Sequence, residues 1–547
     1  MAHLGDRLRA LLGRTRTPAP SKTVISTHSE RKVVVSSILV LLLIGLPLWW
    51  TTTRVYRAAL PTVEINRYTP ADALHIPVHF YVDVDPALPQ QLAVAGIQKD
   101  AQARIAKSRM PYGADEWRVE YSAVVARGSA PRNMPGHYTL RVVHADADAD
   151  ADSVAVRVDR TAVVALSTSP RSARKVEQRV AQVVAAIVSQ EERAVRGGQA
   201  RGAMRYAKHI SMTLTLLNEN PVGGAQVDWE IEGAVSRFVQ PLVDALQPLT
   251  RLSVTSQVLH HAGPPPIMSV VRNNATYLTP PMLAHFVNSP SWNFASVDPA
   301  APMLNFVLYV PALASQPVRI LESADHKVPV ATNAFSVPQW GGVAIANLPP
   351  HTKPGAKVVL SPDDLQPYMG VFVAQLRSLL GIRNNAPLAR TEAGGSFDFT
   401  VSVERDSETG ISGWELDALM RQWMVHGRRT AITTLQSLVR LVDSLQNMVV
   451  MDEIKAQVDQ SLAALTAIDA SLADHLAAFT VAARAAVLAE TAFFDPSMVS
   501  MLYFPDQHKY AIYFPFFVPV AIPVLSAIRR LVARRKPRTA ASAKKND

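Results

Sequence analysis

The stretch AIYFPFFVPVAIPVLSAI, residues 511–528, decides the architecture because it contains no charged residue and Arg529-Arg530 follow it at once. As an α-helix rising about 1.5 Å per residue, it would span roughly 27 Å, close to the apolar thickness of a bilayer. A second such stretch, VVVSSILVLLLIGLPLWW, occupies residues 33–50 and follows Arg31-Lys32. Both are typical of transmembrane helices, so everything between them is expected to be one long extramembrane segment.

Three prolines, Pro515, Pro519 and Pro523, recur every four residues in the later stretch, so a helix would place them on one face. Each proline removes a backbone donor and bends the helix, and in lipid the freed carbonyl groups need other partners. Two interpretations stay open. Either this face packs inside a multi-subunit membrane bundle, which makes the prolines candidate packing residues, or the helix is a kinked but solitary anchor.

The net charge of +10 is a property of the two ends of the chain. Residues 1–32 hold seven Lys or Arg and two Asp or Glu, and residues 529–547 hold eight and one, so these tails carry +12 and the rest carries −2. A nucleic-acid interface needs a basic face on a folded domain, so we set that class aside. By the positive-inside rule both tails are cytosolic and residues 51–510 are lumenal or extracellular.

The first apolar stretch is interpreted as an uncleaved signal anchor. A cleaved signal peptide would have a shorter apolar region and a small-residue cleavage site, and no clear site of this kind follows Trp50.

The sequence contains no cysteine, which excludes disulfides, a thiol nucleophile and a thiolate metal site within this chain. It also has no G-x-S-x-G elbow, H-E-x-x-H pair, P-loop or dinucleotide fingerprint. His260-His261 are adjacent, so on a strand they would point to opposite faces and would need other ligands to hold one ion. His75 and His79 would share a face, without an identifiable partner. We therefore expect no catalytic residue, no metal and no cofactor.

Between the two apolar stretches, strand and helix patterns alternate, which favours an α/β fold with a large mixed sheet and packed helices. Strands are predicted at 76–84, 138–143, 153–168, 210–218, 252–261, 303–311 and within 328–348. Helices are predicted at 91–110, 171–196, 229–249 and 367–382, with Pro241 bending or splitting the third. The helix at 171–196 is predicted from an apolar stripe that consists of Val176, Val180, Val183, Val184, Ile187 and Val188.

Two long amphipathic helices are predicted at 414–449 and 451–491, and together they favour a C-terminal helical hairpin. They either pack on each other and on the sheet domain, or dock another subunit. The expected organisation is a cytosolic basic tail (1–32), a transmembrane helix (33–50), a lumenal α/β domain (51–405), a lumenal helical hairpin (406–492), a lumenal juxtamembrane segment (493–510), a second transmembrane helix (511–528) and a second cytosolic basic tail (529–547).

Two local features concern the lumenal region. The run HADADADADS, residues 144–153, alternates aspartate with alanine, and like-charge repulsion favours a solvated hairpin tip over a loose cation site. The tripeptide Asn274-Ala275-Thr276 is a glycosylation sequon in a loop on the side that the charge pattern makes lumenal, so Asn274 is a candidate glycosylation site.

Several stretches in order along the chain resemble the PIG-S family, subunit S of the GPI transamidase complex. They are GLPLWWTTTRVYRAALP (45–61), WEIEGAVSRFVQP (229–241), PMLNFVLYVP (302–311), ATNAFSVPQWGG (331–342), VFVAQLRSLLGI (371–382), WELDAL (414–419) and ETAFFDPSMVSMLYFPDQHKYAIYFPFFVP (490–519). The last is the strongest. The aspartate/alanine run and the two tails match no part of the family pattern.

The resemblance implies a subunit of an endoplasmic reticulum membrane complex. That complex removes a C-terminal hydrophobic signal from a precursor and joins the new C-terminus to a preformed GPI lipid. In the family this chemistry belongs to a caspase-like subunit with a Cys/His pair. A cysteine-free chain is then expected to be a non-catalytic scaffold that binds the other subunits, with GPI and proprotein as ligands of the complex. The alternative is a stand-alone lumenal hydrolase or transferase acting on glycolipid.

Overall fold

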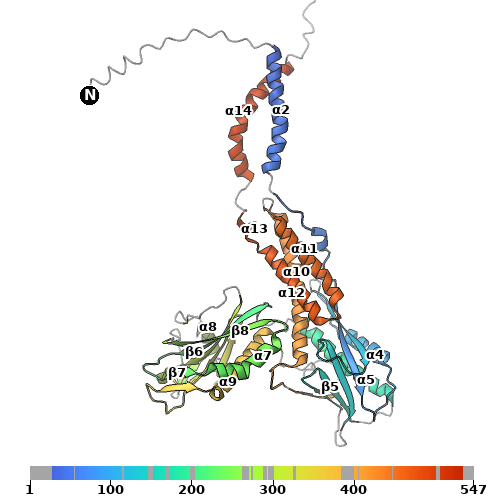
Figure 1. Cartoon of the computed structure of the whole chain (residues 1–547), viewed down its shortest axis with the longest axis vertical. Coiled ribbons are helices and arrows are strands. Elements are labelled where there is room, and N and C mark those ends of the chain that lie inside the picture. The colour runs from blue at the N-terminus through green and yellow to red at the C-terminus, as the bar shows by residue number, and fades with distance from the viewer. Residues whose placement is uncertain are drawn as a thin grey trace, which may run out of the picture. The chain divides into compact units, whose positions relative to one another are not determined.

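The structure is a computed structural model, and its helices and strands form two compact units, which are described separately (Figure 1). The smaller unit comprises Met1–Ala59, Arg440–Lys455 and Phe494–Asp547, and the larger unit comprises Leu60–Val439 and Ala456–Phe493. The structure describes residues 28–53, 56–113, 116–145, 152–167, 172–196, 204–261, 270–272, 275–286, 292, 301–323, 328–382, 399–404, 406–445, 448–500 and 506–533.

A six-stranded sheet forms one part of the larger unit, in the order β16-β4-β5-β3-β1-β2. Its neighbours run parallel except for the hairpin of β4 and β5. The strands are β1 (Leu74–Val84), β2 (Val119–Arg127), β3 (His137–His144), β4 (Asp152–Val156), β5 (Thr161–Leu166) and β16 (Phe399–Val403). Two helices, α4 (Val94–Ser108) and α5 (Ala173–Arg196), pack on each other and on β2. The predicted apolar stripe of α5 is buried along its whole length, which confirms that prediction.

A five-stranded sheet forms another part of the same unit, in the order β13-β14-β11-β6-β8. Its strands are β6 (His209–Asn218), β8 (Arg251–His260), β11 (Met303–Val310), β13 (Ala334–Val337) and β14 (Gly341–Ile345). The central strands β6 and β11 are near-continuous apolar runs because parallel strands between covered faces are buried on both sides.

The remaining strands form two smaller sheets. One has the order β12-β10-β9 and consists of β9 (Val270–Arg272), β10 (Ala275–Leu278) and β12 (Val318–Ile320). The other is the pair of β7 (Gln226–Trp229) and β15 (Lys357–Leu360). A short helix α8 (Pro280–Phe286) and a 3₁₀ turn η2 (Leu313–Ser315) lie in this part of the chain.

The α/β class is therefore confirmed, with several sheets in place of one large one. The predicted helix at 229–249 is split as Pro241 suggested: α6 (Ile231–Ala234), a π-helical turn η1 (Val235–Val239) and α7 (Gln240–Leu246), with the proline in the first turn of α7. Helix α9 (Pro362–Leu380) begins five residues before the prediction. Ser361 and Asp364 form a capping box there, and Pro362 occupies the first turn.

The C-terminal helical region contains three long helices, so the predicted two-helix hairpin is wrong in one respect. They are α10 (Gly413–Ser444), α11 (Asp452–Ser471) and α12 (His475–Phe493), and two short helices, α3 (Thr62–Asn66) and α13 (Pro496–Ser500), lie elsewhere in the chain. The predicted second helix is interrupted between α11 and α12, where the carboxylate of Asp474 accepts the backbone amides of Leu476 and Ala477. Aspartate at an N-cap starts a new helix because its side chain replaces the missing backbone acceptors.

The hairpin prediction for the aspartate/alanine run is also wrong. The run joins β3 to β4, and β5 lies between these two strands in the sheet, so the connection crosses over a neighbouring strand. Residues 146–151 themselves lie outside the described residues.

The smaller unit contains helices over both predicted membrane stretches, α2 (His28–Thr53) and α14 (Asp506–Ala533). The Trp49 ring of α2 lies 5.3 Å from that of Tyr513 and 5.4 Å from that of Phe517, both on α14. Just after α2, the guanidinium of Arg57 donates to three carbonyl oxygens near the end of α10, those of Val442, Leu445 and Met448. Val442 lies in the last turn of α10, where carbonyls lack a helical amide, and Leu445 and Met448 follow the helix, so an arginine is a suitable cap.

Among the described residues, one helix, His475–Met498, is long and apolar enough to cross a membrane, and 44% of its most apolar part is buried. The apolar part of α2, Ser36–Trp49, is shorter.

Candidate functional site

The three prolines singled out from the sequence lie within α14 and are exposed, in the smaller unit. Pro515 follows Tyr513 by two helical positions and Pro519 follows Phe517 by two, roughly 200° around the helix from these residues that contact α2, and Pro523 follows Phe517 by six, roughly 240°. The proline face is therefore turned away from α2. Asn274, the candidate glycosylation site, lies outside the described residues.

The histidine pairs do not form a metal site among the described residues, which contain no group of three or more His, Cys, Asp or Glu suited to a metal ion. His260 ends β8 and His261 follows in a left-handed turn with φ 58°, both exposed. His75 lies 3.6 Å from Glu120 on β2. The His79 ring stacks on His137 of β3 with centroids 4.4 Å apart, and burial together with this neighbour lowers the pKa of His79.

A buried ionic cluster is the most strongly organised polar feature of the larger unit. Arg421 of α10 is 1% exposed. Its guanidinium donates to both carboxylate oxygens of Glu191 on α5, to the Tyr138 hydroxyl at 2.8 Å and to Nδ1 of His475 at 3.3 Å. Burial alone would lower the pKa of Arg421, yet the charge of Glu191 and the other oxygens raise it well above its ordinary value. One side chain thus joins α5, β3, α10 and α12.

A second buried pair lies one helical turn before Arg421. Asp417, which is fully buried, accepts from Arg160 at 2.7 and 2.8 Å and from the backbone amide of Gly136 at 3.0 Å. His475 donates from Nε2 to the carbonyl of Pro77 at 2.8 Å. Burial and the charge of Arg421 lower the pKa of His475 to about 3, so the ring is neutral. The cluster is satisfied internally, which suits a structural core better than acid–base chemistry.

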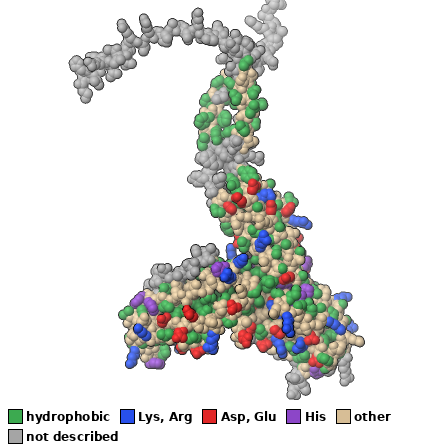
Figure 2. All heavy atoms as spheres, viewed as in Figure 1, with side chains coloured by type: hydrophobic (Ala, Val, Ile, Leu, Met, Phe, Trp, Pro, Cys, Tyr) green, Lys and Arg blue, Asp and Glu red, His purple; other side chains and the backbone are tan. Residues whose placement is uncertain are grey.

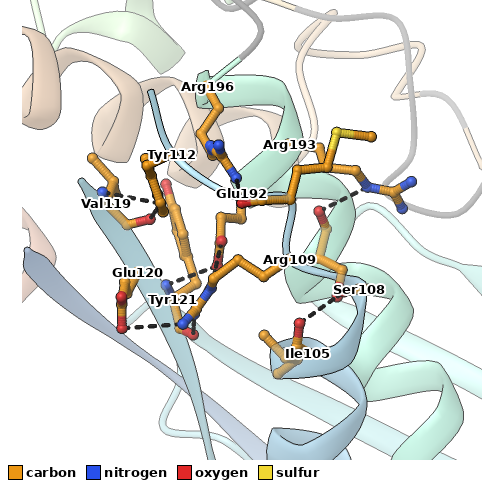
Figure 3. Close-up of polar contacts among 12 residues, drawn as sticks. Ile105, Ser108, Arg109, Tyr112, Val119, Glu120, Tyr121, Glu192, Arg193 and Arg196 are labelled. Atoms are coloured by element: carbon orange, nitrogen blue, oxygen red, sulfur yellow. Dashed lines mark hydrogen bonds and ion pairs between the residues drawn. The ribbon is translucent and has the colours of Figure 1, made fainter. Parts of the chain in front are cut away.

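The open edge of β2 is closed by side chains (Figure 3). Arg109 holds Glu192 at 2.7 Å and donates to the carbonyl of Tyr121 at 3.3 Å. Glu192 in turn accepts a hydrogen bond from the backbone amide of Tyr121 at 3.2 Å. The Tyr112 hydroxyl donates to the carbonyl of Val119 and accepts from the amide of Val119. Further along, Gln102 donates to the carbonyl of Ala123 and Gln98 accepts the amide of Val125. The backbone groups on this edge are therefore occupied.

A cavity of about 510 Å³ lies beside α5, α9, β16 and α10 in the larger unit. Its wall carries the ion pair of Arg377 with Glu415, joined at 2.7 Å, and that of Arg421 with Glu191. These two pairs leave none of their four charged groups free to act as an acid or a base, and the wall also includes Arg157, Glu404 and Asp406.

Comparison with known proteins identifies a family and several proteins that are similar to this chain. The family model described as "PIG-S: Phosphatidylinositol-glycan biosynthesis class S protein" matches residues 36–538. The chain belongs to this family. A GPI-anchor transamidase component PIGS from Homo sapiens is 31% identical over 529 residues, covering 90% of this chain and 93% of the relative. The corresponding Bos taurus protein is 30% identical over 531 residues with the same coverage. The GPI transamidase component GPI17 of Saccharomyces cerevisiae is 24% identical over 499 residues, 88% of each chain.

The PIG-S resemblance expected from the sequence is therefore confirmed, and its blocks coincide with particular elements of the fold. PMLNFVLYVP contains β11, ATNAFSVPQWGG contains β13 and VFVAQLRSLLGI forms most of α9. The strongest block, 490–519, runs from the end of α12 through α13 into α14. The sequence does not reveal the Arg421 cluster or the contact of Glu192 with the β2 edge, because the partners of Arg421 lie 54 to 283 residues away along the chain and Glu192 lies 71 residues from Tyr121.

Proposed function

We propose that this chain is a non-catalytic structural subunit of the GPI transamidase complex of the endoplasmic reticulum membrane. In that role it supports attachment of a preformed GPI anchor to the C-terminus of precursor proteins. The observation that carries the proposal is similarity over about 90% of the chain to proteins named as components of GPI transamidase. The match spans both terminal helices and the body between them, so it concerns the whole organisation.

The non-catalytic part of the proposal rests on the chemistry of the residues. The chain contains no cysteine and so has no thiolate nucleophile. The buried histidine of the Arg421 cluster is neutral and bonded on both ring nitrogens. We therefore assign the peptide cleavage and transfer to a caspase-like partner subunit, with GPI lipid and proprotein as ligands of the complex. The alternative of a stand-alone glycolipid hydrolase or transferase has no specific observation in its favour.

Two membrane spans, 33–50 and 511–528, are part of the same proposal. Large apolar side chains of both helices are exposed, including Leu43 at 76% and Phe516 at 73%. Figure 2 shows hydrophobic side chains covering the visible face of this helix pair, with almost no charge. An apolar exposed surface of this kind is stable in lipid and unfavourable in water.

We interpret His475–Met498 as a core helix although it meets the length and composition test. Its Phe479 contacts the rings of Tyr206 and Trp423, and the carbonyl of Ala485 accepts from Ser461 on α11. The exposed residues Thr480, Arg484, Val487 and Thr491 follow one face at helical spacing and include a charge, as in an amphipathic helix whose other side packs on protein.

The proposed topology places both tails in the cytosol and residues 51–510 in the lumen, divided into the α/β domain, helical region and juxtamembrane segment expected from the sequence. Glycosylation of Asn274 would report this orientation, because the sequon is modified only in the lumen. Asn274→Gln is expected to abolish a mobility shift that endoglycosidase removes from the unchanged chain. A chain that carries no glycan and is digested by protease added outside sealed microsomes would contradict the topology.

Complementation tests the proposed function. The full chain is expressed in cells that lack their own class S subunit, and a GPI-anchored reporter is measured at the cell surface. We expect the reporter to return. A matched variant without residues 506–547 retains the larger unit but lacks the second anchor, and it is expected to fail. Correct localisation of the full chain without any return of the reporter would contradict the proposal.

A further inference from the structure

The edge strands β2 and β8 of the two main sheets in the larger unit differ in whether side chains occupy their outward backbone groups. At β2, side chains of α4, α5 and the loop between α4 and β2 occupy the backbone groups of the open edge, as described above. Such closure is one of the ways by which proteins prevent an edge strand from pairing with another chain. The five-stranded sheet ends in β8, and there the corresponding protection is missing among the described residues.

The register of β8 shows which of its backbone groups are open. It runs parallel to β6 over ten residue pairs, from His209 with Arg251 to Asn218 with His260. The amide of Arg251 donates to the carbonyl of Lys208 at 2.9 Å, so Arg251 and every second residue after it bond toward β6. The intervening residues turn their amides and carbonyls outward: Leu252, Val254, Ser256, Val258 and His260. Within the described part of the chain, these outward groups have no hydrogen-bond partner.

The composition of β8 makes its open edge a strong template for pairing. The sequence RLSVTSQVLH contains no proline, glycine, lysine or acidic residue, and its interior, residues 252–259, is uncharged. Proline, lysine and inward-facing charges are the usual devices that block edge pairing. Most side chains of β8 are half-buried and Ser256 is exposed, as expected of a strand without a neighbour on one side.

We infer that the β8 edge binds an extended segment of another subunit, which adds to the five-stranded sheet as a sixth strand. This inference rests on the proposed function, because it requires a multi-subunit assembly. A ten-residue unprotected edge is an aggregation hazard whenever it is free. A constitutive partner subunit covers it continuously, whereas a passing substrate would leave it open between turnovers.

The ends of β8 define the chemistry of the partner segment. Arg251 lies at one end, and His260 and His261 lie at the other, all exposed. The five outward residues offer alternating amides and carbonyls along an uncharged middle section. The matching segment is an extended stretch of about eight to ten residues with an uncharged, β-branched or small middle and acidic flanks, held by main-chain hydrogen bonds.

Site-specific cross-linking tests this contact directly, because the chain has no other thiol. Ser256→Cys, labelled with a photoreactive maleimide, is expected to cross-link to another subunit within the complex in native membranes. Ser122→Cys is the matched control on the closed β2 edge, and it is expected to give no such product. A cross-link from Ser256→Cys only to residues of its own chain, or none at all, would overturn the inference.

A proline substitution gives an independent measurement. Ser256→Pro removes an amide that points outward and leaves the ladder between β6 and β8 intact. We expect it to lower recovery of partner subunits by about tenfold or more, whereas Ser256→Ala recovers them fully. Equal recovery with both variants, while the unchanged chain brings down its partners, overturns only this inference. Recovery of no partner by the unchanged chain would overturn the proposed function as well.

Discussion

At the scale of single residues, Arg421 is the side chain on which the core of the larger unit depends most. Its contacts with Glu191, Tyr138 and His475 leave it almost no exposed surface. Arg421→Met is expected to lower the free energy of unfolding by about 3–5 kcal/mol, because it leaves the carboxylate of Glu191 buried without a counter-ion. The fall in melting temperature of the detergent-solubilised chain measures this effect.

Arg104→Met is the control for that substitution. Arg104 pairs with Asp100 on the surface of α4, with both side chains about 40% exposed. Exposed pairs of this kind change stability by about 0.5 kcal/mol or less. Equal melting temperatures for the two variants would contradict the importance given to the Arg421 cluster.

His475 gives the fold a pH dependence of known sign. Its pKa in the folded protein is about 3, against 6.5 for an ordinary histidine, through burial and the charge of Arg421. Below pH 6.5, His475 therefore binds a proton in the unfolded chain but not in the folded protein. The free energy of unfolding falls as the pH decreases toward 3. Asp417 opposes this shift and His79 adds to it.

His475→Gln tests that dependence, since glutamine does not take up the proton. We expect the melting temperature of the variant to fall less than that of the unchanged chain between about pH 7.5 and about pH 5. The variant is also expected to be less stable at the higher pH, because it loses well-placed hydrogen bonds. A pH-dependent fall as large as that of the unchanged chain would contradict the assignment.

The burial of a single residue can be predicted from the sequence when the pattern that determines it lies within one helix or strand. The buried stripe of α5 follows from spacing within one helix and was predictable. Arg421 was not predictable, since a charged residue on α10 is ordinarily placed at the surface. Its burial is stabilised only because α5, β3 and α12 bring partners from distant parts of the chain.

At the scale of elements, Gly427 sets the distance between α10 and α12. A Cβ atom built on Gly427 would lie 3.1 Å from the carbonyl oxygen of Ala482, which is backbone and cannot rotate away. Gly427→Val is expected to push the helices apart and lower the free energy of unfolding by about 1–3 kcal/mol. Gly370→Ala in α9 meets no atom within 4 Å and is expected to stabilise the protein by about 0.5–1 kcal/mol. Equal effects of the two substitutions would contradict this close helix crossing.

The proline face of α14 is a second prediction at this scale. Pro515, Pro519 and Pro523 are exposed on the side away from α2, so we propose that they pack against, or line a cavity with, neighbouring membrane helices. Replacing all three with leucine is expected to reduce assembly and GPI attachment. Phe514→Leu with Phe516→Leu is the control, because it keeps the helix apolar and its backbone unchanged. Unchanged assembly of the triple variant would favour the solitary anchor.

The long helices and the central strands were predictable because apolar periodicity and proline positions are local signals. Strand β2 and the short strands β7, β9, β10, β12, β15 and β16 were not predicted, and the predicted strand 153–168 is the hairpin of β4 and β5. The interruption between α11 and α12 was missed, since the alanine-rich sequence continues a helical pattern across it and only Asp474 marks the new start. The placement of β3 and β4 on opposite sides of β5 was missed because strand order depends on contacts that no single segment encodes.

At the scale of the whole molecule, three features of the described residues agree with a role in assembly: an apolar helix pair, a buried ionic cluster that is satisfied internally, and the open edge of β8. The family was recognisable from the sequence because its blocks occur in order over nearly the entire chain. The difference between the β2 edge and the β8 edge could not be predicted, because it depends on which side chains reach the backbone of β2 and not that of β8.

The most direct measurement is purification of the tagged full chain from endoplasmic reticulum membranes in mild detergent, with the bound proteins identified by mass spectrometry. We expect recovery of a caspase-like cysteine protease together with other membrane subunits, and transamidase activity that requires the cysteine of that partner. Recovery of this chain alone, in a detergent that preserves the complex around another tagged subunit, would contradict its role as a structural subunit.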